Sequence, residues 1–136
     1  MSQESPSTDA PPPALHWIPV RGDSMWPSLR AGDLAGVEPL AGEPVPGEVV
    51  LARFDHALVL HRVRRCESGV LALRGDNSPA EDPPLPRSRI LGRVRRVRRG
   101  GAVLEDGWDR GPWRLGRWRA AVKWRVAALL GRGGRR

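Results

Sequence analysis

A serine and a histidine in this sequence have neighbours that suit nucleophilic catalysis. Ser24 lies in the segment Gly22-Asp23-Ser24-Met25-Trp26-Pro27, where glycine and proline favour an irregular loop that can expose a hydroxyl group. A serine hydroxyl is a weak nucleophile until a base removes its proton. His61 is a candidate for that base, because a neutral imidazole takes up and releases protons near neutral pH. If the two side chains lie together in the fold, Ser24 and His61 could act as nucleophile and base.

Carboxylates follow in a polar loop after the apolar run that ends at Leu73. This loop contains Asp76, Glu81 and Asp82. One of these groups could accept the second N–H of His61, which would hold the imidazole in one tautomer and stabilise the imidazolium ion. Each segment taken alone also has a structural interpretation, since turn serines often only bond their own backbone and a strand histidine can be a satisfied core residue.

Short extended segments, broken by glycine and proline, must position these residues. Apolar runs bounded by turn residues predict strands at residues 16–20, 33–39, 47–54, 57–63, 70–73, 90–97 and 102–104. Asp55-His56 and Gly100-Gly101 are expected to be turns between neighbouring strands. The fold class expected is mainly β, a small single domain of short coiled β-sheets, because no βαβ alternation is present.

The two ends of the chain differ from the middle in composition. Residues 1–14 are polar and proline-rich and are expected to be disordered, whereas residues 15–106 are expected to form the β domain. Residues 107–136 are expected to form a basic amphipathic helix and tail. One stripe of that helix would carry Leu115, Trp118, Val122, Val126 and Leu129. The helix could contact a membrane surface, a partner or the β domain.

The charge is divided unevenly along the chain. Residues 1–86 contain 7 basic and 12 acidic side chains, whereas residues 87–136 contain 16 basic and 3 acidic ones, for a net charge of +8. A basic run of this kind can meet the phosphates of nucleic acid or of anionic lipid. Arginine makes up 22 of the 23 basic residues. This compositional bias identifies no partner by itself, and nucleic acid is not the expected one.

Other features limit the cofactor and the compartment. Cys66 is the only cysteine, and His16, His56 and His61 are too scattered for a recognised zinc spacing. Phosphate-binding and dinucleotide-binding motifs are missing, so neither a metal nor a cofactor is expected. The sequence has no secretory signal peptide and no apolar run of the ~20 residues that span a bilayer. We therefore expect a cytoplasmic protein, with contact to the membrane surface through the C-terminal helix left open.

Six short motifs occur in an order that resembles the signal peptidase family, in the clan that also contains the self-cleaving SOS repressors. They are Gly-Asp-Ser-Met-x-Pro, Gly-Asp, Gly-Glu-Val-Val, His-Arg-Val, Gly-Asp-Asn and Gly-Arg-Val, at residues 22–27, 32–33, 47–50, 61–63, 75–77 and 92–94. The resemblance covers residues 17–97. It implies the fold of a signal peptidase and a serine endopeptidase that cleaves a peptide or precursor protein through an acyl-enzyme on Ser24.

The resemblance also implies roles for individual residues. His61 stands where the archaeal and endoplasmic-reticulum branch has its histidine, and the only lysine, Lys123, lies outside the matched region. The orienting carboxylate of that branch maps onto Asp82, with Asp76 as the second candidate. The resemblance also implies that Met25 and Pro27 contact the substrate. The backbone N–H of Ser24 is the expected donor to the oxyanion.

Departures from the family leave other functions open. Membrane signal peptidases have a transmembrane anchor, and this sequence has no segment of that kind. A catalytically inactive peptide-binding or accessory module is one alternative, and a basic module that binds nucleic acid or a membrane surface is another. A self-cleaving repressor is not expected. The Ala-Gly pairs at residues 31–32, 35–36 and 41–42 all lie after Ser24, whereas repressors are cut before the nucleophile. The substrate and the oligomeric state are not indicated.

Overall fold

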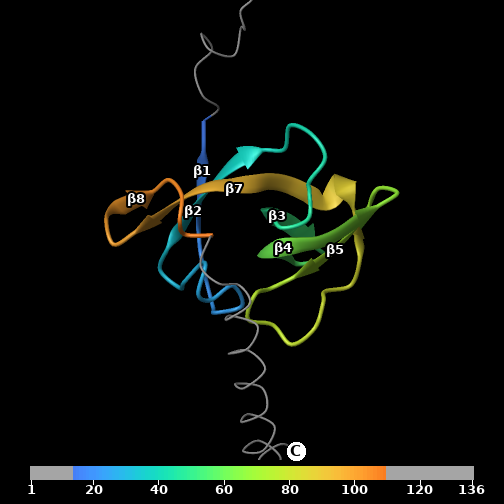
Figure 1. Cartoon of the computed structure of the whole chain (residues 1–136), viewed down its shortest axis with the longest axis horizontal. Helices are drawn as coiled ribbons and strands as arrows, with labels where there is room; N and C mark the ends of the chain where they lie inside the picture. Colours follow the sequence, from blue (N-terminus) through green and yellow to red (C-terminus); the bar gives the residue numbers. More distant parts are fainter. Residues whose placement is uncertain (1–13, 110–136) are drawn as a thin grey trace, which may run out of the picture.

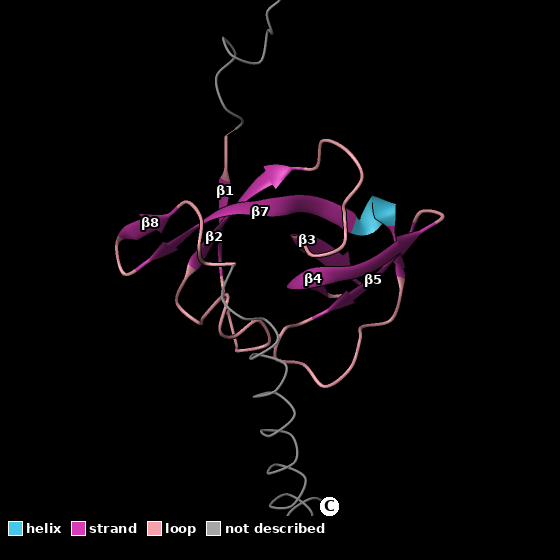
Figure 2. Ribbon diagram, viewed as in Figure 1, coloured by secondary structure: helices cyan, strands magenta, loops and turns pink. Residues whose placement is uncertain are grey.

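The extended runs of the sequence form strands in the computed structural model, which describes residues 14–109 (Figures 1 and 2). The strands are β1 (His16–Pro19), β2 (Leu34–Pro39), β3 (Val49–Phe54), β4 (Ala57–Glu67), β5 (Val70–Arg74), β6 (Leu85–Pro86), β7 (Ile90–Arg99) and β8 (Ala102–Leu104). The predicted mainly β class is confirmed. Strand β4 extends four residues beyond its expected end at Val63. Strand β6 was not expected, because two residues are too few to show an alternating pattern.

All the strands belong to one antiparallel sheet, where several small sheets were expected. The strand order is β1-β2-β7-β3-β4-β5-β6, and β8 pairs with β7. The two predicted turns are present, since Phe54 pairs with Ala57 across Asp55-His56 and Arg99 pairs with Ala102 across Gly100-Gly101. The long strand β7 crosses the middle of the molecule and joins the two halves of the sheet (Figure 1).

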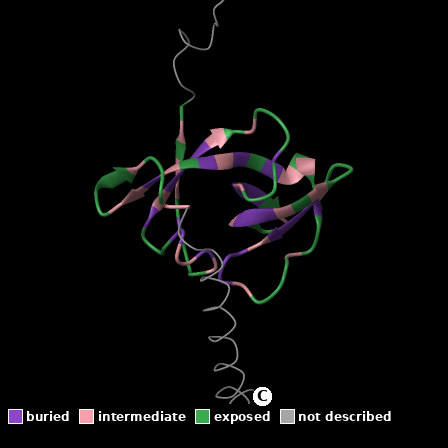
Figure 3. Cartoon of the chain, viewed as in Figure 1, coloured by how far each residue is buried: buried purple, intermediate pink, exposed green. Residues whose placement is uncertain are grey.

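Strand β3 lies between two apolar cores, which explains why four consecutive residues of it are buried. Val49 and Leu51 point into a first core, and Val50 and Ala52 point into a second. Alternation along a strand sends successive side chains to opposite faces, so β3 contributes to both. Buried residues are accordingly concentrated on the inner strands (Figure 3). The site lies where β1, the loop after it and β4 border the first core.

The described residues test only a small part of what was predicted for the C-terminal segment. The only helix within residues 14–109 is the 3-10 turn η1 (Arg87–Arg89), and no helix of this part is long and apolar enough to cross a membrane. The helix expected over residues 112–130 lies wholly outside the described residues, and of the predicted segment 107–136 only residues 107–109 are described. Residues 107–109 form a bend and turn, and Trp108 packs against the first core.

Candidate active site

Ser24 lies in the loop between β1 and β2. Buried apolar side chains and backbone hydrogen bonds hold this loop in place. Met25 and Leu29 are buried in the first core, at 2% and 0% exposure, and the Leu29 N–H donates to the Met25 carbonyl at 3.0 Å. At the base of the loop, the Val20 N–H donates to the Asp33 carbonyl at 2.9 Å. Gly22 has φ of 71°, a conformation that glycine adopts without strain. The buried anchors therefore fix Ser24 at the rim of the core.

Asp33 is a second support of this loop. Its buried carboxylate accepts two hydrogen bonds from the guanidinium of Arg99, at 3.0 and 2.8 Å, and one from the Arg30 N–H at 2.9 Å. Hydrogen bonding to Asp33 raises the pKa of Arg99 above its ordinary value, against a smaller lowering by burial. Arg99 also donates to the Ser28 carbonyl at 3.1 Å. Strand β7 thus holds the serine loop through a charged contact.

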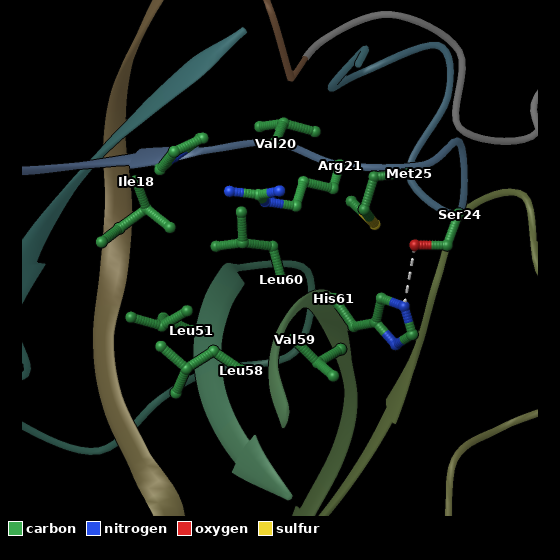
Figure 4. A pocket seen from close by; sticks show the side chains of 11 residues that line it. Ile18, Val20, Arg21, Ser24, Met25, Leu51, Leu58, Val59, Leu60 and His61 are labelled. Carbon is green, nitrogen blue, oxygen red and sulfur yellow. Dashed lines mark hydrogen bonds between the residues drawn. The ribbon is translucent and has the colours of Figure 1, made fainter. Parts of the chain in front are cut away.

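His61 is fixed by its place on β4. It pairs with Val50 of β3, so its backbone belongs to the ladder beside the most buried strand of the sheet. Its residue exposure is 7%. This strand places the imidazole below the serine loop, with the ring directed at Ser24 (Figure 4).

Ser24, His61 and Asp82 form a chain of hydrogen bonds. His61 Nε2 lies 3.1 Å from Ser24 Oγ, and His61 Nδ1 lies 2.5 Å from Asp82 Oδ2. In the tautomer protonated on Nδ1, the imidazole donates to Asp82 and its Nε2 accepts from the serine hydroxyl. Such an arrangement can move a proton from Ser24 to His61 while Asp82 holds the ring and stabilises the imidazolium.

Asp76, the second candidate for that role, has other partners. Its carboxylate accepts from the Nε and Nη2 atoms of Arg62, at 2.8 and 2.7 Å, and from the Ser28 hydroxyl at 3.2 Å. The Asp76 and Arg62 side chains are 2% and 5% exposed. Asp82, and not Asp76, contacts His61 in this structure. The two carboxylates occupy one loop, but the loop turns between them.

Arg62 extends this buried ion cluster to the end of the described chain. Its Nη1 donates to the Gly47 carbonyl at 2.7 Å and lies 2.6 Å from Asp109 Oδ1. Burial lowers the pKa of Arg62, but the hydrogen bonds and charges of Asp76 and Asp109 outweigh it, and the net pKa is raised. Burial raises the pKa of Asp109 above its ordinary value, although Arg62 partly opposes this.

The segment Gly75-Asp76-Asn77 clamps the serine loop against β4. The Asn77 N–H donates to the Ser24 carbonyl at 2.7 Å, and the Asn77 amide donates to the Asp23 carbonyl at 3.0 Å. A Cβ atom on Gly75 would lie 2.6 Å from the Ser24 carbonyl oxygen and 2.9 Å from His61 Nε2. Glycine is therefore needed there, because the backbone passes directly behind the serine–histidine pair.

An apolar groove of about 590 Å³ begins at the Ser24–His61 pair and runs between β1 and β4 (Figure 4). Its floor and walls are mainly aliphatic, and they are formed by Ile18, Pro19, Val20, Met25, Leu51, Leu58, Val59 and Leu60, with Arg21 at the rim. Concave apolar sites with a few convergent polar groups are the usual form of a ligand site. The reactive pair therefore opens onto a surface able to hold an extended peptide.

Comparison with known proteins shows the family of the chain. A family model described as peptidase S24-like matches residues 3–95 of the chain. The chain belongs to the peptidase S24-like family. The match includes Ser24, His61 and Asp82. No curated protein and no solved structure matches the chain.

Membership of the peptidase S24-like family confirms the expected clan of signal peptidases and self-cleaving repressors. The narrower assignment to the serine–histidine branch stays a prediction. Met25 lines the groove, where the resemblance placed it, and its sulfur accepts from the Asp76 N–H at 3.3 Å. Pro27 does not line the groove, although it was expected to contact the substrate. Met25 is 2% exposed and packs in the first core, and the Leu29 N–H donates to its carbonyl at 3.0 Å.

Sequence reasoning missed several residues that shape this peptidase S24-like site. Ser28, Arg62 and Asn77 hold the loops that bear Ser24 and Asp82, yet no role was predicted for them. Arg62 and Asn77 belong to the quoted motifs His-Arg-Val and Gly-Asp-Asn, so the signal was present. Nothing in the sequence indicated that Asp109, 47 positions after Arg62, would pair with it.

Proposed function

We propose that this protein is a serine endopeptidase that cleaves a peptide or precursor protein, with Ser24 as nucleophile and His61 as general base. The observation that carries the proposal is the 3.1 Å contact between Ser24 Oγ and His61 Nε2 at the mouth of an apolar groove. A binding module needs the groove but has no use for an oriented serine–histidine pair. The family of the chain, which is one of peptidases and self-cleaving repressors, agrees with this reaction type.

The proposed reaction has two steps. Ser24 Oγ attacks the scissile carbonyl carbon as His61 Nε2 takes the hydroxyl proton, and the imidazolium then passes that proton to the departing amine. A water molecule next attacks the acyl-enzyme with His61 again as base, which releases the acid product and restores Ser24. Asp82 accepts the Nδ1–H throughout. Within residues 14–109 the backbone N–H of Ser24 makes no hydrogen bond, so it can donate to the oxyanion.

Unpaired strand edges suggest how the substrate would lie. Strand β1 pairs only with β2, and residues 57–61 of β4 pair only with β3 among the described strands. The groove lies between these two edges. An extended peptide placed there would add main-chain hydrogen bonds to an edge and present its carbonyl groups to Ser24. We therefore propose a substrate that binds as an extended strand.

Two of the three Ala-Gly pairs are held within the fold, which disfavours self-cleavage at those two bonds. The pair Ala35-Gly36 lies within β2, which is hydrogen-bonded to β1 on one side and to β7 on the other. A bond in the middle of a sheet cannot enter the groove without unfolding. At Ala31-Gly32, the Gly32 N–H donates to the Val20 carbonyl at 3.2 Å, inside the serine loop itself.

A basic binding module has less support from the described residues. Four arginines of β7 lie within 4.0 Å of carboxylates, in the pairs Arg93–Glu48, Arg95–Glu38, Arg96–Glu105 and Arg99–Asp33. Paired arginines have less charge to offer to phosphates. Within residues 14–109 the positive charge of β7 is therefore largely used in the protein's own contacts.

A serine-reactive fluorophosphonate probe tests the mechanism by intact mass. We expect one adduct on the wild-type protein and none on Ser24→Ala or His61→Ala, because the hydroxyl reacts only when the imidazole removes its proton. Ser88→Ala, which removes an exposed serine on η1, is the matched control and should label like wild type. Equal labelling of all four proteins, or labelling of none, would contradict an activated Ser24.

A further inference from the structure

The groove beside Ser24 contains one formally charged side chain apart from the catalytic histidine. The other lining residues are aliphatic, except for Met25, Pro19 and Ser24. Arg21 is exposed and precedes Ser24 by three positions on the same loop. Its side chain runs along the groove between Val20 and Leu60, on the side of Met25 away from Ser24 (Figure 4). Arg21 is therefore placed to face a bound peptide in the groove, beyond Met25 from the reactive serine.

Most other arginines near the site already have carboxylate partners, and Arg21 does not. Arg62 pairs with Asp76, Arg65 with Glu81, Arg93 with Glu48 and Arg99 with Asp33. Within residues 14–109, Arg21 makes no ion pair and no side-chain hydrogen bond. Among the residues that the structure describes, its guanidinium group therefore has no acceptor, and its donors can bind a substrate carboxylate.

We propose that Arg21 selects substrates that have an aspartate or glutamate close to the scissile bond, on the side of the bond that occupies this groove. The inference rests on the proposed endopeptidase function and adds the chemistry of its substrate. A guanidinium group binds a carboxylate through two parallel hydrogen bonds, which gives geometric selectivity as well as attraction. A lysine or arginine at the same substrate position would be repelled. The remaining groove positions favour apolar side chains.

The expected selectivity is moderate because Arg21 is exposed. Ion pairs between exposed groups contribute up to ~1 kcal/mol, which corresponds to a preference of about five-fold in kcat/KM. Salt screens such pairs, since the Debye length falls from ~10 Å at 0.1 M to ~3 Å at 1 M. The preference for acidic substrates should therefore shrink as salt is added, whereas the preference for apolar residues should not.

A peptide library blocked by acetyl and amide groups at its ends is the test, with products identified by mass spectrometry. Blocked ends ensure that a terminal carboxylate cannot take the place of an acidic side chain. We expect acidic residues to be enriched about five-fold at one position near the cleaved bond by the wild-type protein. Arg21→Gln should lose this enrichment, and Arg21→Glu should favour lysine or arginine there. Arg30→Gln removes an exposed arginine of the same loop that does not line the groove, and it should behave as wild type.

The outcomes separate the inference from the function on which it rests. Cleavage with no acidic enrichment, or with enrichment that persists in Arg21→Gln, overturns the role of Arg21 and leaves the endopeptidase function intact. Wild-type protein that cleaves no peptide overturns the endopeptidase function and the inference with it. Enrichment that is lost in Arg21→Gln, kept in Arg30→Gln and reversed in Arg21→Glu supports both.

Discussion

Replacing Asp82 by asparagine tests which carboxylate serves His61. The change keeps the shape of the side chain and removes its negative charge, at a contact of 2.5 Å to Nδ1. A hydrogen bond to a charged group contributes ~1.5–3 kcal/mol, which corresponds to ~10- to ~150-fold in rate. An amide can also hold the imidazole in the wrong tautomer, and in a serine–histidine–aspartate triad this substitution costs up to ~10⁴-fold. We therefore expect kcat/KM to fall by about 10²- to 10⁴-fold.

The stability of this variant should change little. The Asp82 side chain is 21% exposed, and its backbone N–H, which donates to the Leu73 carbonyl at 2.8 Å, is unaffected. We expect the free energy of unfolding in urea to fall by about 1.5 kcal/mol or less, the lower end of what a hydrogen bond to a charged group contributes, because the contact is partly exposed and the amide can still bond to the imidazole.

Asp76→Asn is the matched control, because it makes the same chemical change six residues earlier. It weakens a buried two-bond ion pair with Arg62, and loss of one partner of such a pair costs ~3–5 kcal/mol. Its main effect should be on the free energy of unfolding, with kcat/KM per folded molecule much less affected than in Asp82→Asn. The reasoning is refuted if Asp82→Asn keeps near wild-type kcat/KM while Asp76→Asn is inactive and fully stable.

Three further substitutions test the backbone beside the site, the packing of the second core and the pKa of Asp109. Gly75→Ala should lower kcat/KM at least ten-fold, measured on folded protein, because its Cβ would lie 2.6 Å from the Ser24 carbonyl oxygen and displace the loop; unchanged kinetics would mean that the clamp is dispensable. Leu71→Ala, at a fully buried site of the second core, should lower the free energy of unfolding by ~2–5 kcal/mol in urea melts and spare kcat/KM per folded molecule. Burial raises the pKa of Asp109 above 3.8, so its folded form binds a proton more readily than the unfolded chain does. The wild type should therefore lose stability relative to Asp109→Asn as pH rises from below 3.8 through the raised pKa, and a constant difference in urea titrations across that range would contradict the shift.

Local sequence patterns were sufficient to predict most of the strands. The runs around residues 47–54 and 57–63 alternate or are continuously apolar, and the intervening Asp55-His56 forms the tight turn that such a pattern requires. Strand β6 was not predicted, because its two residues pair with Val70 and Leu71 only once the loop between β5 and β6 has folded. The extension of β4 to Glu67 was missed for a related reason, since pairing with β5 continues the strand through polar residues.

The candidate pair could also be predicted, because its residue types and motif order are properties of the chain itself. A serine in a glycine–proline loop and a histidine in an alternating strand indicate nucleophile and base, and the ordered motifs favour the family that the match to residues 3–95 shows. The resemblance favoured Asp82 over Asp76 for orienting His61, but the residues themselves did not show which carboxylate contacts the imidazole. Both carboxylates lie in one polar loop, and their partners depend on how that loop turns after Leu73.

The sequence by itself thus determined the mainly β class and the family, and it indicated Ser24 and His61 as the candidate nucleophile and base. Only the tertiary structure decided that Asp82 contacts His61, that Asp76 is buried against Arg62, and that an apolar groove lies beside the pair. The physical reason is that strand patterns and turn residues act over a few neighbours. The site, in contrast, joins loops and strands 37 and 21 positions apart, whose distances follow from the order of strands in the sheet.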